Sequence, residues 1–236
     1  MRLRKSLATA VAAVALSGTA LTTGLTSAGA AGNMATVTVI HGIPKVPVTV
    51  YANNNVLIAN FIFGKSVGPV ELAAGTYKLD IRPRGASVST KPILTKTVTL
   101  TPGYNATVSA NLTSLGKPVI NAVGNPLTDP AAGNARVIVR HMAEAPGVDV
   151  YAGATTGAPL ISNLKNGTGA GTEVPAGTYS ISVYVHGTKT GRVLGPLSLK
   201  LDAGKTYIVY AIGSAVAKPS TLTVVSQSYQ NVLPTT

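Results

Sequence analysis

Hydrophobic and polar residues alternate along much of this chain, and no segment shows the sustained longer period of a helix. The alternation begins at Val37-Thr-Val-Ile-His41, passes a proline-bearing loop and resumes at Val48-Thr-Val-Tyr51. The same pattern returns 100 positions later, without a gap, at Val137-Ile-Val-Arg-His141 and Val148-Asp-Val-Tyr151. Alternation with period two among β-branched residues is typical of β-strands. The sequence therefore predicts a tandem duplication of a β-domain.

Two further landmarks recur in the same order in both copies. Ala74-Gly75-Thr-Tyr77 matches Ala176-Gly177-Thr-Tyr179, and each opens an alternating strand behind a glycine turn. Val98-Thr-Leu-Thr-Pro-Gly103 matches Leu199-Lys-Leu-Asp-Ala-Gly204, a strand followed by a tight turn. Each copy thus holds about seven short strands, which predicts an all-β fold of two tandem immunoglobulin-like β-sandwich domains. A single closed barrel, or one sheet shared by both copies, is the alternative.

The duplication also sets the expected domain boundaries. These are a signal peptide at 1–30, a first sandwich at 35–123, a linker at 124–134 and a second sandwich at 135–234. The linker lacks alternation and contains two prolines and two glycines, and it is short enough that the sandwiches should touch. Lys96 falls where the second copy has Leu197, on the inner face. This favours a strand end or an edge strand there, from which the lysine head reaches water.

The first 30 residues have the pattern of a secretory signal peptide. Arg2, Arg4 and Lys5 precede an apolar run from Leu7 to Leu16, and small residues lead to the A-x-A site at Ala28-Gly-Ala30. The alternative is an uncleaved membrane anchor, but the apolar run is short for a bilayer span. A chain without cysteine cannot carry a lipoprotein anchor. We expect cleavage after Ala30 and a secreted, extracellular bacterial protein, free or associated with the cell wall, with no membrane attachment after cleavage.

The charge of the chain narrows the class of partner. The chain carries 19 basic and 7 acidic residues, a formal charge of +12, and loss of Arg2, Arg4 and Lys5 leaves 16 against 7, or +9. Only 11% of residues are charged. Without a basic helix or an aromatic-basic motif, this pattern does not predict nucleic-acid binding. Anionic cell-wall polymers or surface proteins are the more plausible partners of an exported cationic protein.

The repeated motif resembles a known protein family. The pattern A-x-V-x-V-x-H, a proline-containing loop, V-x-V-Y and then A-G-T-Y looks like the domain of unknown function 4397 family, and the resemblance covers about residues 35–225. It implies an exported bacterial β-domain protein, and the family brings no established activity and no catalytic residues. The second copy fits best. The first copy departs from the pattern because Thr49 replaces Asp149 and Lys45-Val46 replaces a loop of shorter side chains.

The motif residues favour structure over chemistry. A histidine near an aspartate could be a base, a ligand or part of a triad, but we interpret each motif histidine as ending its strand and bonding the next loop. His186 is interpreted as a solvated loop residue. Zinc needs three or four ligands, and no such spacing occurs, nor does a G-x-S-x-G elbow, so no metal, cofactor or catalytic residue is predicted. The structural motif residues are His41, Pro44, Tyr51, His141, Pro146, Asp149 and Tyr151.

One basic cluster is present in only one copy. We expect Lys78, Arg82, Arg84 and Lys91 to form a stripe on an outward strand face and its turn, which could contact an anionic polymer or be a solvated face. The resulting hypothesis is a non-catalytic binding or structural module of the bacterial envelope. An accessory domain pair that acts beside separate enzymes is compatible with the same sequence. The alternative is a secreted hydrolase of cell-wall polymers with a cleft near His141 and Asp149.

Overall fold

The computed structural model describes residues 33–126 and 128–230, so the expected signal peptide and the end of the chain lie outside it. The first copy forms β1 (Met34–His41), β2 (Val48–Ala52), β3 (Asn55–Phe61), β4 (Ser66–Ala73), β5 (Gly75–Pro83), β6 (Leu94–Leu100), β7 (Asn105–Leu112) and β8 (Pro118–Gly124). The second copy forms β9 (Asn134–Glu144), β10 (Val148–Ala152), β11 (Ile161–Leu164), β12 (Gly169–Pro175), β13 (Gly177–Val185), β14 (Arg192–Leu201), β15 (Lys205–Ser214) and β16 (Thr223–Gln230).

Each copy is a β-sandwich of two four-stranded sheets. The sheets of the first copy have the orders β4-β1-β7-β8 and β3-β2-β5-β6, and those of the second have the orders β12-β9-β15-β16 and β11-β10-β13-β14. Neighbouring strands are antiparallel, apart from the parallel pairs β1–β7 and β9–β15. The prediction of two tandem sandwiches is confirmed, and the barrel and the shared sheet are wrong because the chain forms four separate sheets.

The expected strand count is one too low in each copy. The additional strands lie between the second strand and the A-G-T-Y turn, where β3 and β4 follow one another. Both are edge strands, and both expose residues on two faces rather than in simple alternation. Their sequences therefore lack the regular period that identifies the central strands. No helix among the described residues is long and apolar enough to cross a membrane.

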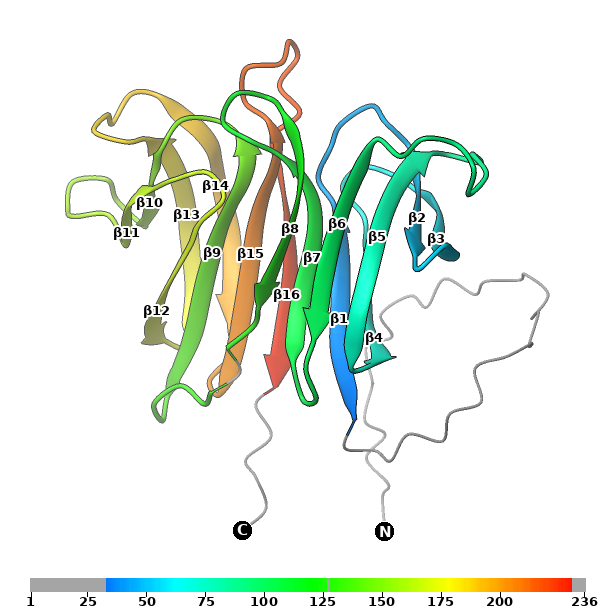
Figure 1. Ribbon diagram of the computed structural model, residues 1–236. Coiled ribbons are helices and arrows are strands. Elements are labelled where there is room, and N and C mark those ends of the chain that lie inside the picture. Colours follow the sequence, from blue (N-terminus) through cyan, green and yellow to red (C-terminus); the bar gives the residue numbers. More distant parts are fainter. Residues whose placement is uncertain (1–32, 127, 231–236) are drawn as a thin grey trace, which may run out of the picture.

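The two sandwiches pack against each other through their inner sheets, so that four sheets lie side by side (Figure 1). Strand β7 lies against β9 and β15 at this interface. The apolar part of the interface consists of Ile40 from the first copy with Ile138, Met142, Ile208, Tyr210 and Ile212 from the second. The contact expected from the short linker is confirmed.

Buried polar groups also join the sandwiches. Arg140 is 3% exposed, and its guanidinium donates to Tyr210 Oη at 2.7 Å, to Asn125 Oδ1 at 2.9 Å and to the carbonyl of Gly124. Tyr210 Oη in turn donates to Thr107 Oγ1 at 2.7 Å. Burial of a cation costs free energy unless its donors have partners. These oxygens come from both copies and from the linker, so the network stabilises one relative orientation of the two sandwiches.

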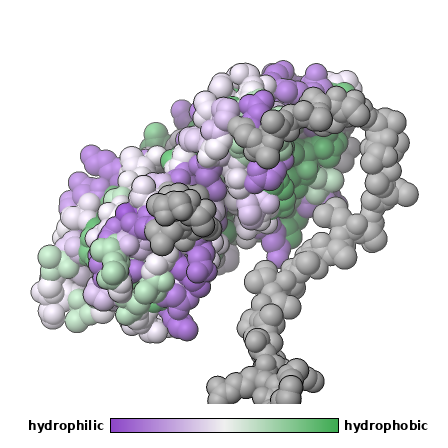
Figure 2. All heavy atoms as spheres, turned by 90° about the horizontal axis from the view of Figure 1, so that it is seen from below, coloured by the Kyte–Doolittle hydropathy of each residue, from purple (hydrophilic) through white to green (hydrophobic). Residues whose placement is uncertain are grey.

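The two cores are filled differently. In the first sandwich, 16 buried hydrophobic residues form one continuous cluster between the sheets, and β6 approaches β8 closely along one edge. In the second sandwich the buried hydrophobic residues divide into two clusters of four. Seen from below, the molecule shows two lobes, and hydrophobic residues are visible on the flank of the right-hand lobe (Figure 2).

Candidate functional site

The two motif histidines have the same geometry in both copies. His41 Nε2 donates to the carbonyl of Val46 at 2.7 Å, and His141 Nε2 donates to the carbonyl of Pro146 at 2.9 Å. On the other side of each ring, Nδ1 faces a backbone N–H two residues later at 3.4 Å. Burial lowers the pKa of both rings, and the loop carbonyl only partly offsets this effect. Each ring is therefore neutral and links the end of a strand to the following loop by hydrogen bonds.

Asp149 is paired with a different histidine from the one considered in the hydrolase hypothesis. Its Oδ1 lies 2.8 Å from Nδ1 of His186 and accepts from the backbone N–H of Asn163, and its Oδ2 accepts from the N–H of Gly187 at 3.0 Å. His186 is exposed in the turn after β13, as expected of a solvated loop residue, but its ring is also bound to a buried carboxylate, which the sequence did not predict. Burial raises the pKa of Asp149, but the three hydrogen bonds outweigh it and lower the pKa to about 2.

The first copy uses an uncharged residue for the same turn. Thr49 Oγ1 accepts from the backbone N–H of Gly85 at 3.2 Å, as Asp149 accepts from Gly187 in the second copy. Gly85 and Gly187 both have a positive φ, a conformation that favours glycine. Residue 49 or 149 therefore shapes a turn in each copy, and the departure of Thr49 from the family pattern removes a charge but keeps this hydrogen bond.

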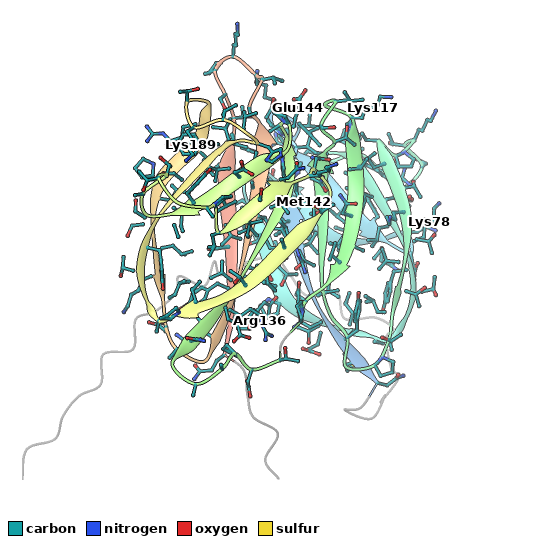
Figure 3. The ribbon with its side chains drawn as sticks, turned by 90° about the vertical axis from the view of Figure 1, so that its left-hand side faces the viewer. Lys78, Lys117, Arg136, Met142, Glu144 and Lys189 are labelled. Carbon is teal, nitrogen blue, oxygen red and sulfur yellow. The ribbon has the colours of Figure 1, made fainter. Side chains whose placement is uncertain are left out.

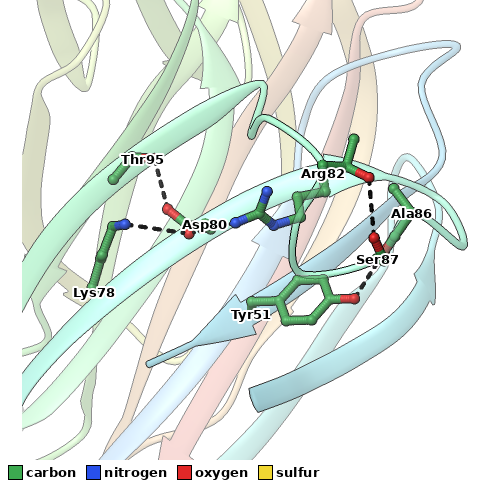
Figure 4. A network of polar contacts seen from close by, with 8 residues as sticks. Tyr51, Lys78, Asp80, Arg82, Ala86, Ser87 and Thr95 are labelled. Atoms are coloured by element: carbon green, nitrogen blue, oxygen red, sulfur yellow. Dashed lines mark hydrogen bonds and ion pairs between the residues drawn. The ribbon is translucent and has the colours of Figure 1, made fainter. Parts of the chain in front are cut away.

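The expected basic stripe is not one exposed surface. Arg82 is 4% exposed, its Nη2 lies 2.9 Å from Asp80 Oδ2, and its guanidinium lies 5.5 Å from the centre of the Tyr51 ring (Figure 4). The cover is the β5–β6 loop, which is held by the hydrogen bond from Tyr51 Oη to the carbonyl of Ala86. Burial raises the pKa of Asp80, but Thr95, Lys78 and Arg82 together lower it below its usual range. The placement of Arg82 on an outward exposed face is thus corrected.

The remaining members of the stripe lie on the strand face and in the turn that follows it. Lys78 stays on the flank of β5, 57% exposed and 3.6 Å from Asp80. Arg84 and Lys91 lie on the β5–β6 loop at one end of the molecule. Arg84 contacts Asn60, and neither cation forms an ion pair with a described carboxylate. Their role in polymer contact stays a prediction, but their location points to a larger cationic surface.

That surface is the end of the molecule at which β1, β7, β9 and β15 finish, and we call it the cationic loop end. It comprises the eight loops 42–47, 62–65, 84–93, 113–117, 145–147, 165–168, 186–191 and 215–222. These described loops contain no aspartate or glutamate and eight exposed cations: Lys45, Lys65, Arg84, Lys91, Lys117, Lys165, Lys189 and Lys218. Figure 3 shows Lys117 and Lys189 at this end, together with Glu144, the last residue of β9.

The opposite end has the reverse composition. Its described loops carry Asp129 and Asp202 and no lysine or arginine. Separation of eight cations from the acidic residues produces a directional field, which attracts polyanions to one end. The sequence contained this signal, because alternate turns of an antiparallel sandwich share one end and the lysines fall in alternate turns. The pattern along any single strand does not contain it, because the cations lie in separate loops.

Two other features of the described residues are weaker candidates for a site. An open groove of about 570 Å³ lies beside the linker, and its walls include Arg136 and Arg140. Both cations already have partners, since Arg136 is paired with Glu173 and Arg140 belongs to the buried network. In residues 33–126 and 128–230, no group of three or more histidines and carboxylates could hold a metal ion. The cationic loop end is therefore the strongest candidate.

Comparison with known proteins identifies the family but no function. No curated protein matches the chain significantly. Among solved structures, the Bacillus anthracis TIE protein is 10% identical, with a TM-score of 0.25, over 84% of this chain and 43% of that one. A "putative cell adhesion protein" from Bacteroides eggerthii is 12% identical, with a TM-score of 0.18, over 84% of this chain and 96% of that one. These scores are too low to support an argument.

The family match is confined to part of the chain. Residues 35–151 match the family model described as "Domain of unknown function (DUF4397)". The match therefore begins in β1, covers the first sandwich and the linker, and ends in β10, just after the second copy of the motif. The resemblance seen in the repeated A-x-V-x-V-x-H and V-x-V-Y motifs is confirmed, and the chain belongs to the domain of unknown function 4397 family.

Proposed function

We propose that this protein is an exported, non-catalytic binding module of the bacterial envelope, and that its cationic loop end binds anionic cell-wall polymers. The observation that carries the proposal is the segregation of eight exposed cations, without a carboxylate in the same loops, at one end of a two-sandwich body. The interface network supports it, because loops from both sandwiches must keep fixed relative positions to act as one surface.

The burial of the motif residues also favours binding over hydrolysis. His141 is 2% exposed and Asp149 is 4% exposed. His141 is bonded to its own loop, and Asp149 is bonded to His186 and to backbone N–H groups. A general base must reach a substrate proton, and neither side chain lies in an open cleft. The hydrolase alternative depends on these two residues and therefore has no specific observation in its favour.

The proposal is tested by co-sedimentation of the mature protein with cell walls that bear teichoic acids. A loop-end variant would combine Lys117→Ser, Lys165→Ser and Lys218→Ser. Because attraction between exposed charges weakens as the Debye length falls from ~10 Å at 0.1 M salt to ~3 Å at 1 M, binding by the parent protein should fall steeply with salt. The loop-end variant should lose at least about tenfold in affinity.

A control variant with the same change of net charge separates the loop end from general attraction. It combines Lys78→Ser, Lys96→Ser and Lys200→Ser, three exposed lysines on strands rather than in these loops. This variant should retain most of the affinity. Equal losses in the two variants, or binding that ignores salt, would remove the loop end from the proposal. Replacement of the whole stripe would be less informative, because removal of Lys78 and Arg82 would leave the buried Asp80 carboxylate without an ion-pair partner.

A further inference from the structure

The second sandwich contains a cavity that the first sandwich lacks. It has a volume of about 250 Å³ and lies between the two sheets of the second copy. The voids at the corresponding level of the first sandwich measure about 20 and 10 Å³. Protein interiors are normally packed to crystal-like density, with few voids larger than a water molecule. A cavity of this size in one of two homologous cores therefore requires an explanation.

The cavity is lined by aliphatic side chains. Its walls come from both sheets, with Val150, Ile181 and Leu197 on one side and Val139, Val209 and Ala211 on the other. The only polar residues that contribute to the lining are Ser198 and Ser226, and both are exposed. The interior therefore offers no hydrogen bonds, and polar groups occur only at the mouth. Water is poorly held in such a space, because a buried water needs two to four polar partners.

The mouth lies along the edge where the two sheets separate. Strands β6 and β8 approach closely in the first sandwich, but β14 and β16 do not close the second to the same degree. The pairing registers show the reason on the β16 side of the mouth. Val224 and Ser226 occupy the positions that Ile120 and Ala122 occupy in the first copy, so this wall is less apolar in the second copy. On the other side Leu197 and Leu199 remain partly exposed. The apolar interior is thus open to molecules from solution.

We propose that this cavity binds a single aliphatic chain with a small polar head, such as a medium-chain fatty acid or alcohol. An apolar cavity of ~150 Å³ already holds benzene, so about 250 Å³ fits a chain of roughly eight to ten carbons. The chain lies between the sheets and replaces the side-chain packing that the first sandwich has. The head lies at the mouth beside Ser226, in contact with water.

The test uses decanoic acid, below its micelle concentration, with the mature full-length protein. Isothermal titration calorimetry should show saturable binding of one molecule per chain, and butanoic acid, which cannot fill the space, should bind at least about tenfold more weakly. The variant Ala211→Leu fills the cavity from its β15 wall and should lower the affinity for decanoic acid at least about tenfold. The absence of saturable binding by the parent protein would overturn the proposal.

Control variants identify the place of binding. Thr97→Leu adds an apolar group at the exposed β6 position that corresponds to Ser198 and should leave the affinity unchanged. Unchanged affinity in Ala211→Leu would show that decanoic acid binds elsewhere and would overturn the proposal. Where Ala211→Leu does not fold, Ser226→Phe at the exposed mouth replaces it, with the same expected loss and the same contradicting result. The loop-end variant should bind decanoic acid like the parent, so this test is independent of the polymer-binding proposal.

Discussion

The first and second sandwiches have the same strand order, the same buried histidines bonded to the following loop, and the same glycine turns. They differ in how the space between their two sheets is filled. The first has one continuous hydrophobic cluster, and the second has two small clusters around a cavity. The second copy instead supplies five of the six buried apolar residues at the contact between the sandwiches. The duplicated motif therefore fixes topology, whereas packing has diverged between a closed core and an open one.

The largest expected effect is a difference in stability loss when the same core position is truncated in each sandwich. Leu79 and Ile181 occupy corresponding positions on β5 and β13, but Leu79 is 6% exposed in the packed core and Ile181 lines the cavity. Leu79→Ala should lower the free energy of unfolding by ~2–5 kcal/mol, because it removes contacts and leaves a void. Ile181→Ala should cost about 1–2 kcal/mol, since its contacts are already incomplete. Urea denaturation of both variants measures this, and equal losses would contradict the difference in packing.

A smaller effect concerns the residue that shapes the turn. Asp149→Thr places in the second copy the residue that the first copy uses at position 49. The variant should lose ~1–3 kcal/mol at neutral pH, because Asp149 accepts more hydrogen bonds than Thr49 does and its charge strengthens them. The control Thr49→Val removes a neutral hydrogen bond and should cost ~0.5–1.5 kcal/mol.

The sign of the pH dependence distinguishes these two variants. The pKa of Asp149 is lowered from 3.8 to about 2 on folding, so its stabilising contribution is present above the unfolded value. The contribution is lost as pH falls from about 4 towards 2 and the carboxylate takes up a proton. The difference between the parent and Asp149→Thr should shrink across this window in thermal unfolding curves. The effect of Thr49→Val should stay constant, and a constant effect for Asp149→Thr would contradict the role of its charge.

The fold was more predictable from sequence than the site. Alternation at Val37–His41 and Val137–His141 identified central strands. Such strands pack against other parts of the protein on both faces, so their sequence pattern is regular. Lys96 was expected at a strand end or an edge, and it lies on edge strand β6. The same alternation failed at Arg82, since the β5–β6 loop covers a face that the pattern leaves for solvent. Whether a loop covers a strand face, and how two domains pack together, depends on contacts between distant segments. The alternation within one strand does not reveal such contacts.

Arg140 illustrates the same limit in the second copy. It occupies the position of Ile40 in the repeat, so comparison of the copies shows a difference, but not its meaning. Only the structure places both residues on the contact between the sandwiches, where Arg140 bonds the linker and Tyr210. The cavity was equally hidden, because its wall residues are ordinary strand hydrophobics and the space between them depends on the separation of β14 and β16.

The smallest expected difference between the copies concerns their motif histidines. His41→Ala and His141→Ala should each lower the free energy of unfolding by ~1–2 kcal/mol, because the carbonyl of Val46 or Pro146 loses its donor. Similar losses are expected, since the two rings have the same partners and both are buried. Stoichiometric zinc in the parent protein that is absent from His141→Ala would contradict a purely structural role.

The pH dependence of these histidines runs over a different window from that of Asp149. Burial lowers the pKa of both rings in the folded protein, so they stay neutral at a pH at which the unfolded chain is protonated. As pH falls below about 6.5, the unfolded state gains protons first, and the folded state loses stability until the folded pKa is reached. The free-energy difference between the parent and each variant should therefore be greatest above this pH and shrink below it. Denaturation at a series of pH values, with His41→Ala, His141→Ala and the double variant, would show this. If the free-energy difference between the parent and a variant grows on acidification, the rings are charged in the folded protein, which would contradict their description as neutral.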